Sequence, residues 1–314
     1  MFSNTATTLI GHHPKHIKAI ELAKNIAITK APALILGEAG TGKKRMCEFI
    51  HQSSVRAEGP FMVVDCAKDT AKVEGEVLGY RDEETGKFNK GVLETGNGGT
   101  VVLANIDAID ERFQKRLYQI LTELPDYELD VRVLATSSKN LSKYVSSGRF
   151  QRALFTYFSS TQITLLPLRD RGNDIALLAE VFANEISISK NMGNVVLAED
   201  AKNKLNTFYW THNITELKNV ISNSLDNAKN GVLDVNAIEI GEKKTEVINM
   251  DNDESGFRLM SLKDAERLLI KKALIHTSEN RTQAAKILGV SIRTLRNKIN
   301  EYRGEGNNYF VNLR

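Results

Sequence analysis

The stretch Gly37-Glu38-Ala39-Gly40-Thr41-Gly42-Lys43-Lys44 decides the fold of the first half of this chain. It follows the apolar run 33–36 and precedes a helix-patterned segment at 46–51. A glycine-rich turn between a strand and a helix directs backbone N–H groups at an anion, and the terminal lysine reaches its outer phosphates. We therefore predict a phosphate-binding loop made by all eight residues. Lys44 stands where the general motif has the Ser or Thr that holds magnesium.

Apolar runs and amphipathic segments alternate up to about residue 168, which indicates an α/β domain with a largely parallel sheet. The expected strands are Ala33–Leu36, Phe61–Val64, Thr100–Leu103, Val131–Ala135 and Gln162–Leu165. The expected helices are His16–Ile28, Lys43–Ser53, Glu111–Thr122 and Gly172–Ser189. Residues 169–241 have a helical pattern, which predicts a small lid domain. Residues 242–256 are charged and poor in apolar residues, so we expect a linker before a helical domain at 257–314.

The composition is that of a soluble globular protein, with 41% hydrophobic and 26% charged residues among 314. No apolar run approaches the roughly 20 residues that a membrane span needs. The first eight residues are polar, and we expect no cleavable signal segment. Cys47 and Cys66 lie in apolar-patterned segments without a CxxC pair. Buried free thiols and a cytoplasmic location are expected.

Charge is unevenly distributed along the chain, although the net charge is only +3. Residues 256–314 contain 12 Lys and Arg against 5 Asp and Glu, whereas the rest contains 30 against 34. A basic end on a mildly acidic body suggests that this end contacts nucleic acid.

Three histidines, His12, His13 and His16, lie close together at the start of the first expected helix. A metal cluster would need carboxylate or cysteine partners nearby, and the sequence has none there. We expect no metal site. The histidines are expected to cap or cover the start of a helix.

Three helix patterns follow the predicted linker. The first is Ser261–Thr277, which begins with a capping-box pair, Ser261 and Asp264. The second, Thr282–Leu288, ends at Gly289 in a tight turn, and Ser291 caps the third. The apolar positions expected to face inward are Leu262, Ala265, Leu268, Leu269, Ala273, Leu274, Ala284, Ala285, Leu288, Leu295 and Ile299.

Two short helices joined by a glycine-containing turn, the second rich in Arg, Thr and Asn, have helix-turn-helix geometry. Arg pairs with guanine and Asn with adenine, whereas Ser and Thr suit phosphates. The residues predicted to read bases in double-stranded DNA are Arg293, Thr294, Arg296 and Asn297, and those predicted to contact phosphates are Ser291 and Lys298. The alternative is a helical hairpin with a solvated basic face.

Residues 280–302, NRTQAAKILGVSIRTLRNKINEY, resemble the Fis-type DNA-binding domain along their full length. The resemblance runs through Ala284-Ala285, Leu288-Gly289, Thr294-Leu295 and Lys298. It favours DNA binding over the plain hairpin. Fis-type domains dimerise through the preceding helix, so the resemblance implies a homodimer formed through Ser261–Thr277.

A phosphate-binding loop and a Fis-type domain in one chain point to a family. Residues 9–303 resemble the bacterial enhancer-binding proteins, which are sigma-54-dependent AAA+ transcription activators. The matching segments are Leu9-Ile10-Gly11, Gly37-Glu38, Gly40-Thr41-Gly42-Lys43, Gly59-Pro60-Phe61, Gly98-Gly99-Thr100, Asp130-Val131-Arg132, Gly148-Arg149-Phe150, Leu166-Pro167-Leu168-Arg169 and Glu216-Leu217-Lys218-Asn219-Val220. The resemblance implies an AAA+ P-loop subdomain at 1–168 and an AAA+ lid at 169–241. The receiver or ligand-sensing domain that often comes first in the family is not expected, because the chain starts at the ATPase-like domain.

Family activators hydrolyse ATP with magnesium in a hexameric ring. They remodel the sigma-54 RNA polymerase holoenzyme with a surface loop of sequence GAFTGA. The resemblance therefore implies ATP or ADP as a ligand of residues 37–44. The family's loop usually reads GESGTGKE, so a missing Ser or Thr is normal there, but Lys44 replaces an acid with a base.

The second nucleotide motif departs from the family. Family members read GGTLFLDEI, where the Asp helps to hold magnesium and the Glu polarises water; here the same stretch reads GGTVVLANI, with Ala104 and Asn105. Alanine offers a metal no oxygen, and a neutral amide cannot act as a general base. Strand alternation is expected to place Asp107 on the face opposite residue 104, which makes it a poor substitute. Asp65 stands where the family's glutamate-switch Asn usually lies.

The other catalytic positions have changed as well. The segment that resembles FREDLYYRL has Gln151 and Tyr157 at the arginine-finger positions, and Arg152 lies one place out of register. In the segment that resembles WPGNVREL, Thr215 replaces the arginine that would touch nucleotide. Residues 80–90 read YRDEETGKFNK and contain no GAFTGA.

Three interpretations stay open. The preferred one is a sequence-specific DNA-binding transcription regulator whose AAA+ domain has lost ATP hydrolysis and sigma-54 remodelling but still binds a nucleotide or another ligand. In this interpretation the site lacks the carboxylate that would hold magnesium, and the missing arginine fingers argue against a hexamer. The second is an active ATPase with a rearranged site. The third is an inactive partner subunit or antagonist of another activator.

Overall fold

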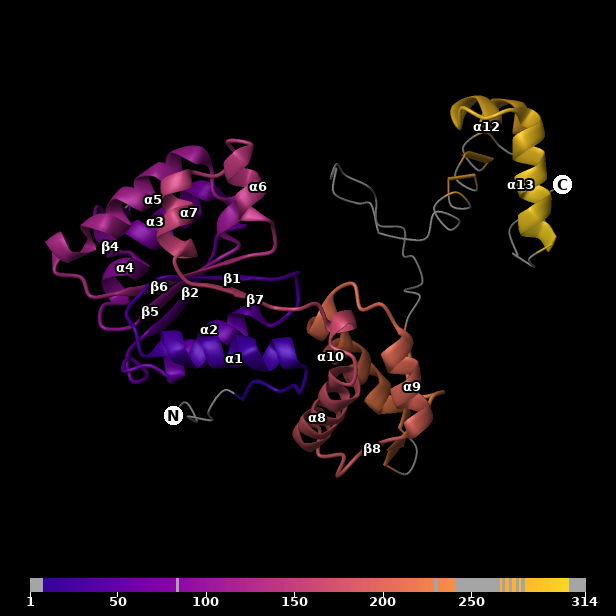
Figure 1. Cartoon of the computed structure of the whole chain (residues 1–314), viewed down its shortest axis with the longest axis horizontal. Coiled ribbons are helices and arrows are strands. Elements are labelled where there is room, and N and C mark those ends of the chain that lie inside the picture. The colour runs from indigo at the N-terminus through magenta and orange to yellow at the C-terminus, as the bar shows by residue number, and fades with distance from the viewer. Residues whose placement is uncertain are drawn as a thin grey trace. The chain divides into compact units, whose positions relative to one another are not determined.

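The computed structural model describes residues 8–82, 85–228, 231–240 and 280–304, together with residues 266, 269, 270, 273, 274 and 277. The chain divides into two compact units, residues 1–242 and residues 243–314, each with its own hydrophobic core (Figure 1). The predicted lid boundary at residue 169 lies inside the first unit. The predicted linker lies outside the described residues.

A five-stranded parallel sheet forms the centre of the first unit. Its order is β2-β5-β6-β1-β7, and its strands are β1 (Ala33–Leu36), β2 (Phe61–Asp65), β5 (Thr100–Ala104), β6 (Arg132–Ser137) and β7 (Gln162–Thr164). All five predicted strands are confirmed, with small shifts at their ends. Because the strands are parallel, the loops that follow β1, β2, β5 and β6 meet at one edge of the sheet.

Helices cover both faces of this sheet because the strand side chains alternate between the faces. On β5, Val101 and Leu103 join one core cluster and Val102 joins the other. The helices on the side of Val102 are α1 (Pro14–Ala27) and α2 (Lys43–Gln52). The helices on the other side are α3 (Thr70–Leu78), α5 (Glu111–Glu123), α6 (Leu141–Ser146) and α7 (Arg152–Ser159) (Figure 1). The predicted helices that correspond to α1, α2 and α5 are thus confirmed, whereas α3, α6 and α7 were not predicted from the sequence.

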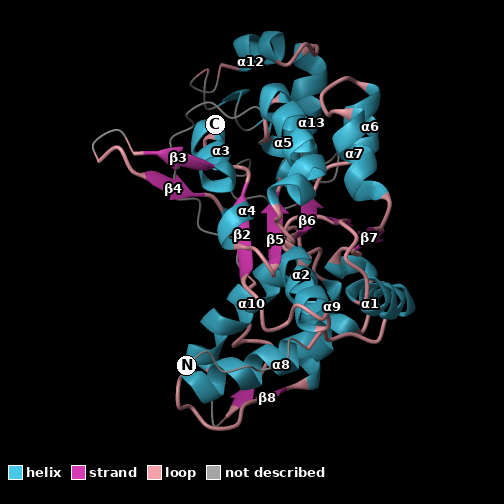
Figure 2. Ribbon diagram, turned by 90° about the vertical axis from the view of Figure 1, so that its left-hand side faces the viewer, coloured by secondary structure: helices cyan, strands magenta, loops and turns pink. Residues whose placement is uncertain are grey.

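An antiparallel hairpin extends from the body of the first unit between α3 and the helical turn α4 (Val92–Thr95) (Figure 2). Its strands are β3 (Gly79–Arg81) and β4 (Phe88–Lys90). Tyr80 and Phe88 are more than half exposed on it. The hairpin occupies the segment where the family resemblance places the polymerase-contacting loop.

The helical part of the first unit is built around Trp210, which is fully buried and donates from Nε1 to the Leu205 carbonyl at 2.9 Å. Its helices are α8 (Asp174–Ser189), α9 (Glu199–Thr207) and α10 (Asn213–Ser224), and the short strands β8 (Val196–Leu197) and β9 (Val232–Leu233) pair in parallel. Three-residue 3-10 turns at Leu168–Asp170 and Leu225–Asn227 flank them. The predicted helix at 172–189 is confirmed and starts two residues later.

The second unit contains α12 (Arg281–Ile287) and α13 (Ile292–Gly304), joined by a turn in which Gly289 has φ +66°. Glycine adopts this left-handed conformation without the steric cost of a Cβ. The buried residues of this unit are Ile270, Ala273, Leu274, Ala284, Ala285, Leu295, Ile299 and Tyr302, and Leu288 packs against them. Leu269 was expected to face inward and is 50% exposed, because the buried face of its helical segment passes through its neighbour Ile270. The capping box of Ser261 and Asp264, together with Leu262, Ala265 and Leu268, lies outside the described residues.

The two cysteines are buried free thiols, as predicted, and burial raises the pKa of both Cys47 and Cys66 to about 12. Among the described helices, none has the length and hydropathy that a membrane span requires.

Candidate nucleotide and nucleic-acid sites

The predicted phosphate loop connects the end of β1 to the start of α2. Gly40 and Gly42 have φ angles of +78° and +95°, a region that favours glycine. A Cβ on Gly40 would lie 2.0 Å from the carbonyl oxygen of His212, so this position also requires glycine for space. Gly42 precedes α2, whose first N–H groups have no intrahelical acceptor. The loop therefore has the shape and the donors of an anion site.

Lys43 lies at the centre of the loop. Its ammonium donates to the carbonyl oxygens of Gly37 and Glu38 and to Oγ of Ser138, each at 2.8 Å. Burial lowers the pKa of Lys43, and the nearby carboxylates of Asp107 and Glu38 act in the opposite direction. Lys44 points away, exposed and 4.0 Å from Glu48. The cation that can meet a phosphate here is Lys43.

The helical part of the unit holds the loop from the other side. Arg169 donates two hydrogen bonds to the Glu38 carboxylate, at 2.7 and 2.5 Å, and these bonds lower the pKa of Glu38. Asn213 donates from Nδ2 to the Ala39 carbonyl at 2.8 Å and accepts at Oδ1 from the Leu168 N–H at 2.7 Å. The Ile214 N–H donates to the Gly40 carbonyl at 3.0 Å. Residues that lie 131 to 175 positions after the loop in the sequence thus hold it in place by hydrogen bonds.

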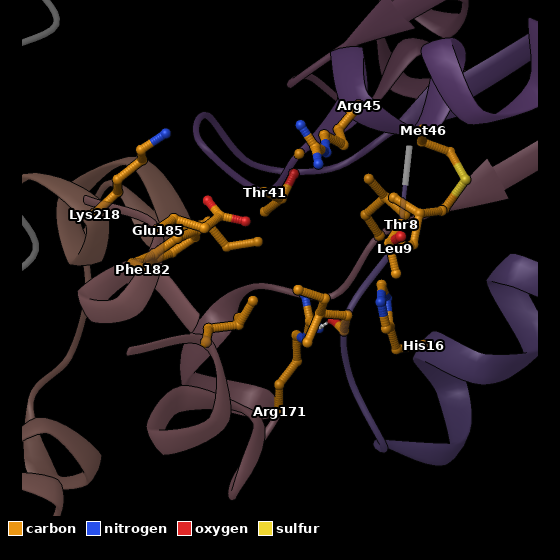
Figure 3. A pocket seen from close by; sticks show the side chains of 15 residues that line it. Thr8, Leu9, His16, Thr41, Arg45, Met46, Arg171, Phe182, Glu185 and Lys218 are labelled. Atoms are coloured by element: carbon orange, nitrogen blue, oxygen red, sulfur yellow. Dashed lines mark hydrogen bonds between the residues drawn. The ribbon is translucent and has the colours of Figure 1, made fainter. Parts of the chain in front are cut away.

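A cavity of about 210 Å³ opens beside the loop, between α2 and α8 (Figure 3). Its apolar lining comes from Leu9, Ile10, Met46, Leu165, Leu178, Phe182 and Ile214. Its charged lining comes from Arg45, Arg171, Glu185 and Lys218. An apolar cavity next to an anion-binding loop suits the base of a nucleotide whose phosphates lie on the loop.

Of the histidines at the start of α1, His16 lines this cavity. His13 caps α1, because its Nδ1 accepts from the Lys15 N–H at 3.3 Å. The N–H of His12 donates to Asp174 at 2.6 Å. His16 is buried in the cavity wall, its Nε2 has no partner in the described part of the chain, and burial lowers its pKa to about 4. The capping role expected from the sequence is confirmed for His13. No cluster of three potential metal ligands occurs among the described residues.

The two positions of the second nucleotide motif lie at the carboxyl edge of the sheet. Ala104 ends β5, and Asn105 follows it with φ +56°. The side-chain amide of Asn105 donates to Asp65 at the end of β2, at 2.9 Å. This pair has the amide and the carboxylate in exchanged places relative to the family pattern described above. Neither Ala104 nor Asn105 supplies a carboxylate to the site.

The expected placement of Asp107 is wrong. The left-handed residue Asn105 ends β5, and Ile106–Ala108 form a 3-10 turn, so strand alternation does not extend to residue 107. Asp107 instead accepts a hydrogen bond at Oδ1 from Oγ of Ser137, at the end of β6. Its carboxylate is close enough to act on the pKa of Lys43. Asp107 therefore lies on the phosphate side of the sheet.

The positions that the family resemblance assigns to arginine fingers hold neutral side chains. Gln151 precedes α7, and its N–H donates to Oε1 of Gln114 at 2.7 Å. Tyr157 stacks edge-on against Phe158 with ring centroids 5.0 Å apart, and burial raises its pKa. Thr215, the residue in the nucleotide-contacting arginine position, is exposed on α10. None of these three side chains carries a positive charge.

The predicted DNA-reading residues lie on α13. Arg293, Thr294, Arg296 and Asn297 are exposed, whereas Leu295 and Ile299 face the core. Ser291 caps the helix, because its Oγ accepts from the Thr294 N–H at 3.0 Å. Lys298 differs from the others, because Glu266 at 3.0 Å and Glu301 at 3.4 Å engage its ammonium. Its predicted phosphate contact would compete with these carboxylates.

Several residues of these sites had no role assigned to them from the sequence. Asn213 and Arg169 act on the loop from the helical part, and Arg45, Glu185 and Lys218 line the cavity. Arg169 and Lys218 lie in segments that carry the family resemblance, and Arg45 and Glu185 lie in helices without a distinctive motif. Long-range packing brings them to the loop.

Family models cover most of the chain. A model described as the sigma-54 interaction domain matches residues 9–164, a model of the AAA+ ATPase lid domain matches residues 169–249, and a model described as "Bacterial regulatory protein, Fis family" matches residues 261–302. In fold, the chain is similar to NtrX from Brucella abortus solved in complex with ADP. The TM-score is 0.67 at 21% identity, over 95% of this chain and 70% of that one. The similarity supports an AAA+ P-loop α/β fold with a helical lid.

Relatives align along most of the chain. The transcriptional regulatory protein FlbD of Caulobacter vibrioides is 30% identical over 322 residues, which cover 95% of this chain and 71% of that protein. The sigma54-dependent transcriptional regulator SfnR of Pseudomonas fluorescens is 33% identical over 244 residues, which cover 73% of this chain and 66% of that protein. This chain therefore belongs to the family of bacterial transcriptional regulators that combine a sigma-54 interaction domain with a Fis-type helix-turn-helix.

Proposed function

We propose that this protein is a sequence-specific DNA-binding regulator whose AAA+ domain binds ATP or ADP as a regulatory ligand and does not hydrolyse it. The observation that carries the proposal is a contrast within one site. The binding half keeps Lys43, the positive-φ glycines and an adjoining apolar cavity. The hydrolytic half has Ala104 and Asn105 in place of two carboxylates.

Nucleotide binding has support from both geometry and comparison. Thr41 and Gly42 of the loop line the cavity, and Lys43 follows them at the start of α2. NtrX, which shares the fold, was solved with ADP and with ATP. The clamp formed by Arg169 and Asn213 would transmit a change at the loop to the helical part, because both side chains bond directly to loop atoms.

Loss of hydrolysis follows from chemistry. Asn105 cannot accept the proton of an attacking water, and its amide is already bonded to Asp65. The loss of an arginine finger alone costs on the order of 10³ in rate or more. With Gln151 and Tyr157 in both finger positions, turnover would lack its base and its trans-acting charge together.

DNA binding is assigned to the exposed face of α13. Arg293 and Arg296 are the residues with the charge and reach for guanine, and Asn297 has the amide for adenine. A two-fold symmetric operator would match a homodimer formed through residues 261–277. The absent fingers argue for this dimer rather than a hexameric ring.

Transcriptional output would differ from that of a standard sigma-54 activator. The hairpin β3–β4 has exposed Tyr80 and Phe88 and no GAFTGA sequence. We infer that the protein represses, or acts through the main housekeeping polymerase. Strong transcription that strictly requires the sigma-54 holoenzyme in a reconstituted assay would contradict this inference.

The test measures binding and turnover on the same sample. Calorimetry with ATP and with ADP should give saturable binding that Lys43→Ala abolishes, and a phosphate-release assay should show no Lys43-dependent turnover. DNA affinity measured with and without nucleotide then reports the regulation. Turnover that depends on magnesium and disappears in Lys43→Ala would instead establish the rearranged ATPase, a candidate that the positions of Asp107 and Asp65 favour.

A further inference from the structure

Asp107 is a carboxylate at the edge of the sheet where the phosphate loop lies. Its Oδ1 accepts from Oγ of Ser137, and the Ser137 carbonyl accepts from the N–H of Gly37, the first loop residue, at 3.2 Å. The next residue, Ser138, accepts a hydrogen bond from the Lys43 ammonium. Asp107 is thus bonded to the serine that binds the first loop residue, and the neighbouring serine binds the loop lysine.

The backbone explains how Asp107 reaches this place. Asn105 has φ +56°, which ends β5 and turns the chain. Ile106 is fully buried and anchors the 3-10 turn that follows. The turn directs the side chain of the next residue toward β6. Asp107 is half-buried, and its Oδ2 has no hydrogen-bond partner in the part of the chain that the structure describes.

Magnesium that accompanies a nucleotide needs little from the protein. Mg²⁺ keeps several waters and is held by one or two carboxylates together with the phosphates, rather than by a cage of protein ligands. One available carboxylate next to Lys43 meets this requirement. Ala104 has no ligand atom, and Asp65 is bonded to Asn105 and to the Ala67 N–H at 3.1 Å.

We propose that Asp107, in place of residue 104, supplies the carboxylate that holds a divalent cation on the phosphates of a bound nucleotide. The inference rests on the proposed nucleotide binding and deepens it. The site binds a magnesium–nucleotide complex, while the absence of a base and of fingers prevents its hydrolysis. Asp107 is then a binding residue and takes no part in bond breaking.

The alternative is that Asp107 only neutralises Lys43 and fastens Ser137. The two roles predict opposite effects of removing the charge. Asp107→Asn keeps an oxygen that can accept from Ser137 and removes one negative charge near the phosphates. If Asp107 binds the cation, the variant loses the gain from magnesium but binds ATP as well or better in EDTA, because a repulsion is gone. If Asp107 is structural, affinity falls in both conditions.

Calorimetry with the full-length protein tests this. ATP is titrated in buffer that contains either millimolar magnesium or EDTA. The proteins compared are wild type, Asp107→Asn and, as a matched control on the surface, Asp126→Asn. We expect magnesium to strengthen ATP binding about tenfold in wild type and in Asp126→Asn, equivalent to about 1.4 kcal/mol. In Asp107→Asn the two conditions should agree within about twofold, and adding Ala104→Asp should restore the difference.

The outcomes separate the inference from the proposed function. ATP binding that magnesium does not strengthen in wild type, or that magnesium still strengthens in Asp107→Asn, overturns the role of Asp107 and leaves nucleotide binding intact. The absence of any ATP or ADP binding in wild type overturns the proposed nucleotide function and the cation site with it. Titrating Mn²⁺ into the wild-type complex and following its electron paramagnetic resonance signal gives a second readout, in which one bound ion should disappear with Asp107→Asn.

Discussion

Asn213 is the residue on which the contact between the helical part and the phosphate loop depends most. It is fully buried at the start of α10, and its φ is +54°. It accepts from the Leu168 N–H at 2.7 Å and donates to the Ala39 carbonyl at 2.8 Å and to Glu38 at 3.2 Å. Replacing it removes these bonds together, so the variant measures how strongly the two parts are joined.

The magnitude follows from these contacts. Leu168 is buried, so its N–H would be left without water or a partner, which costs about 1–3 kcal/mol. Ala39 is exposed and its carbonyl can be hydrated, so the loss there is about 0.5–1.5 kcal/mol. An Ala at this left-handed position adds about 1–2 kcal/mol that Gly would avoid. We expect Asn213→Gly to lower the free energy of unfolding by about 2–4 kcal/mol and Asn213→Ala by about 1–2 kcal/mol more.

Urea unfolding followed by tryptophan fluorescence is the assay, because Trp210 lies in the same core and precedes Asn213 by three residues. Asn219→Ala provides the control, since Asn219 is exposed on the same helix. Nucleotide affinity should fall together with stability in the Asn213 variants. If Asn213→Ala shifts the unfolding free energy no more than Asn219→Ala does, or if Asn213→Gly and Asn213→Ala are equal, then the hydrogen bonds or the backbone conformation do not act as described.

Further predictions concern pH, DNA and the lost carboxylates. Burial lowers the pKa of His16 to about 4 in the folded protein, whereas a histidine in the unfolded chain titrates near 6.5. The unfolded state therefore binds more protons between these pH values, and the free energy of unfolding should fall by roughly 1.4 kcal/mol per pH unit from about pH 6.5 down to about pH 4. His16→Gln should flatten this part of a plot of urea midpoint against pH. Arg296→Ala should weaken operator binding by about 1–3 kcal/mol and relax the base preference, as measured by electrophoretic mobility shifts. The control Arg152→Ala, which changes an exposed arginine of the other unit, should leave DNA binding unchanged. Equal losses of affinity in both variants would show that α13 does not read the bases. The double variant Ala104→Asp, Asn105→Glu should bind ATP more tightly in the presence of magnesium. Its rate of phosphate release should stay below that of an active family member, because Gln151 and Tyr157 remain. Full turnover in this double variant would show that arginine fingers are dispensable here.

The architecture and the phosphate-loop motif could be predicted from the sequence alone. Each predicted strand is a short apolar run, and each long predicted helix has its own apolar periodicity, so segments of about ten residues contain the information. The glycine spacing before Lys43 and the Arg- and Asn-rich helix after Gly289 are local in the same sense. Ala104, Asn105 and Thr215 are substitutions, and their chemistry is evident without coordinates.

The positions of the remaining groups depend on contacts between distant parts of the chain. Asp107 differs from its predicted position because Asn105 takes a positive φ and ends the strand alternation. Ser137, which donates to Asp107, lies 30 positions later in the sequence. The clamp of Arg169 on Glu38 joins residues 131 positions apart, and Lys298 is engaged by Glu266 from the preceding helical segment. Periodicity says which face of an element is buried, but it does not say which distant side chain that face meets. The direction of a side chain beyond a strand end is set by a single dihedral angle and by packing, and neither is visible in the local pattern.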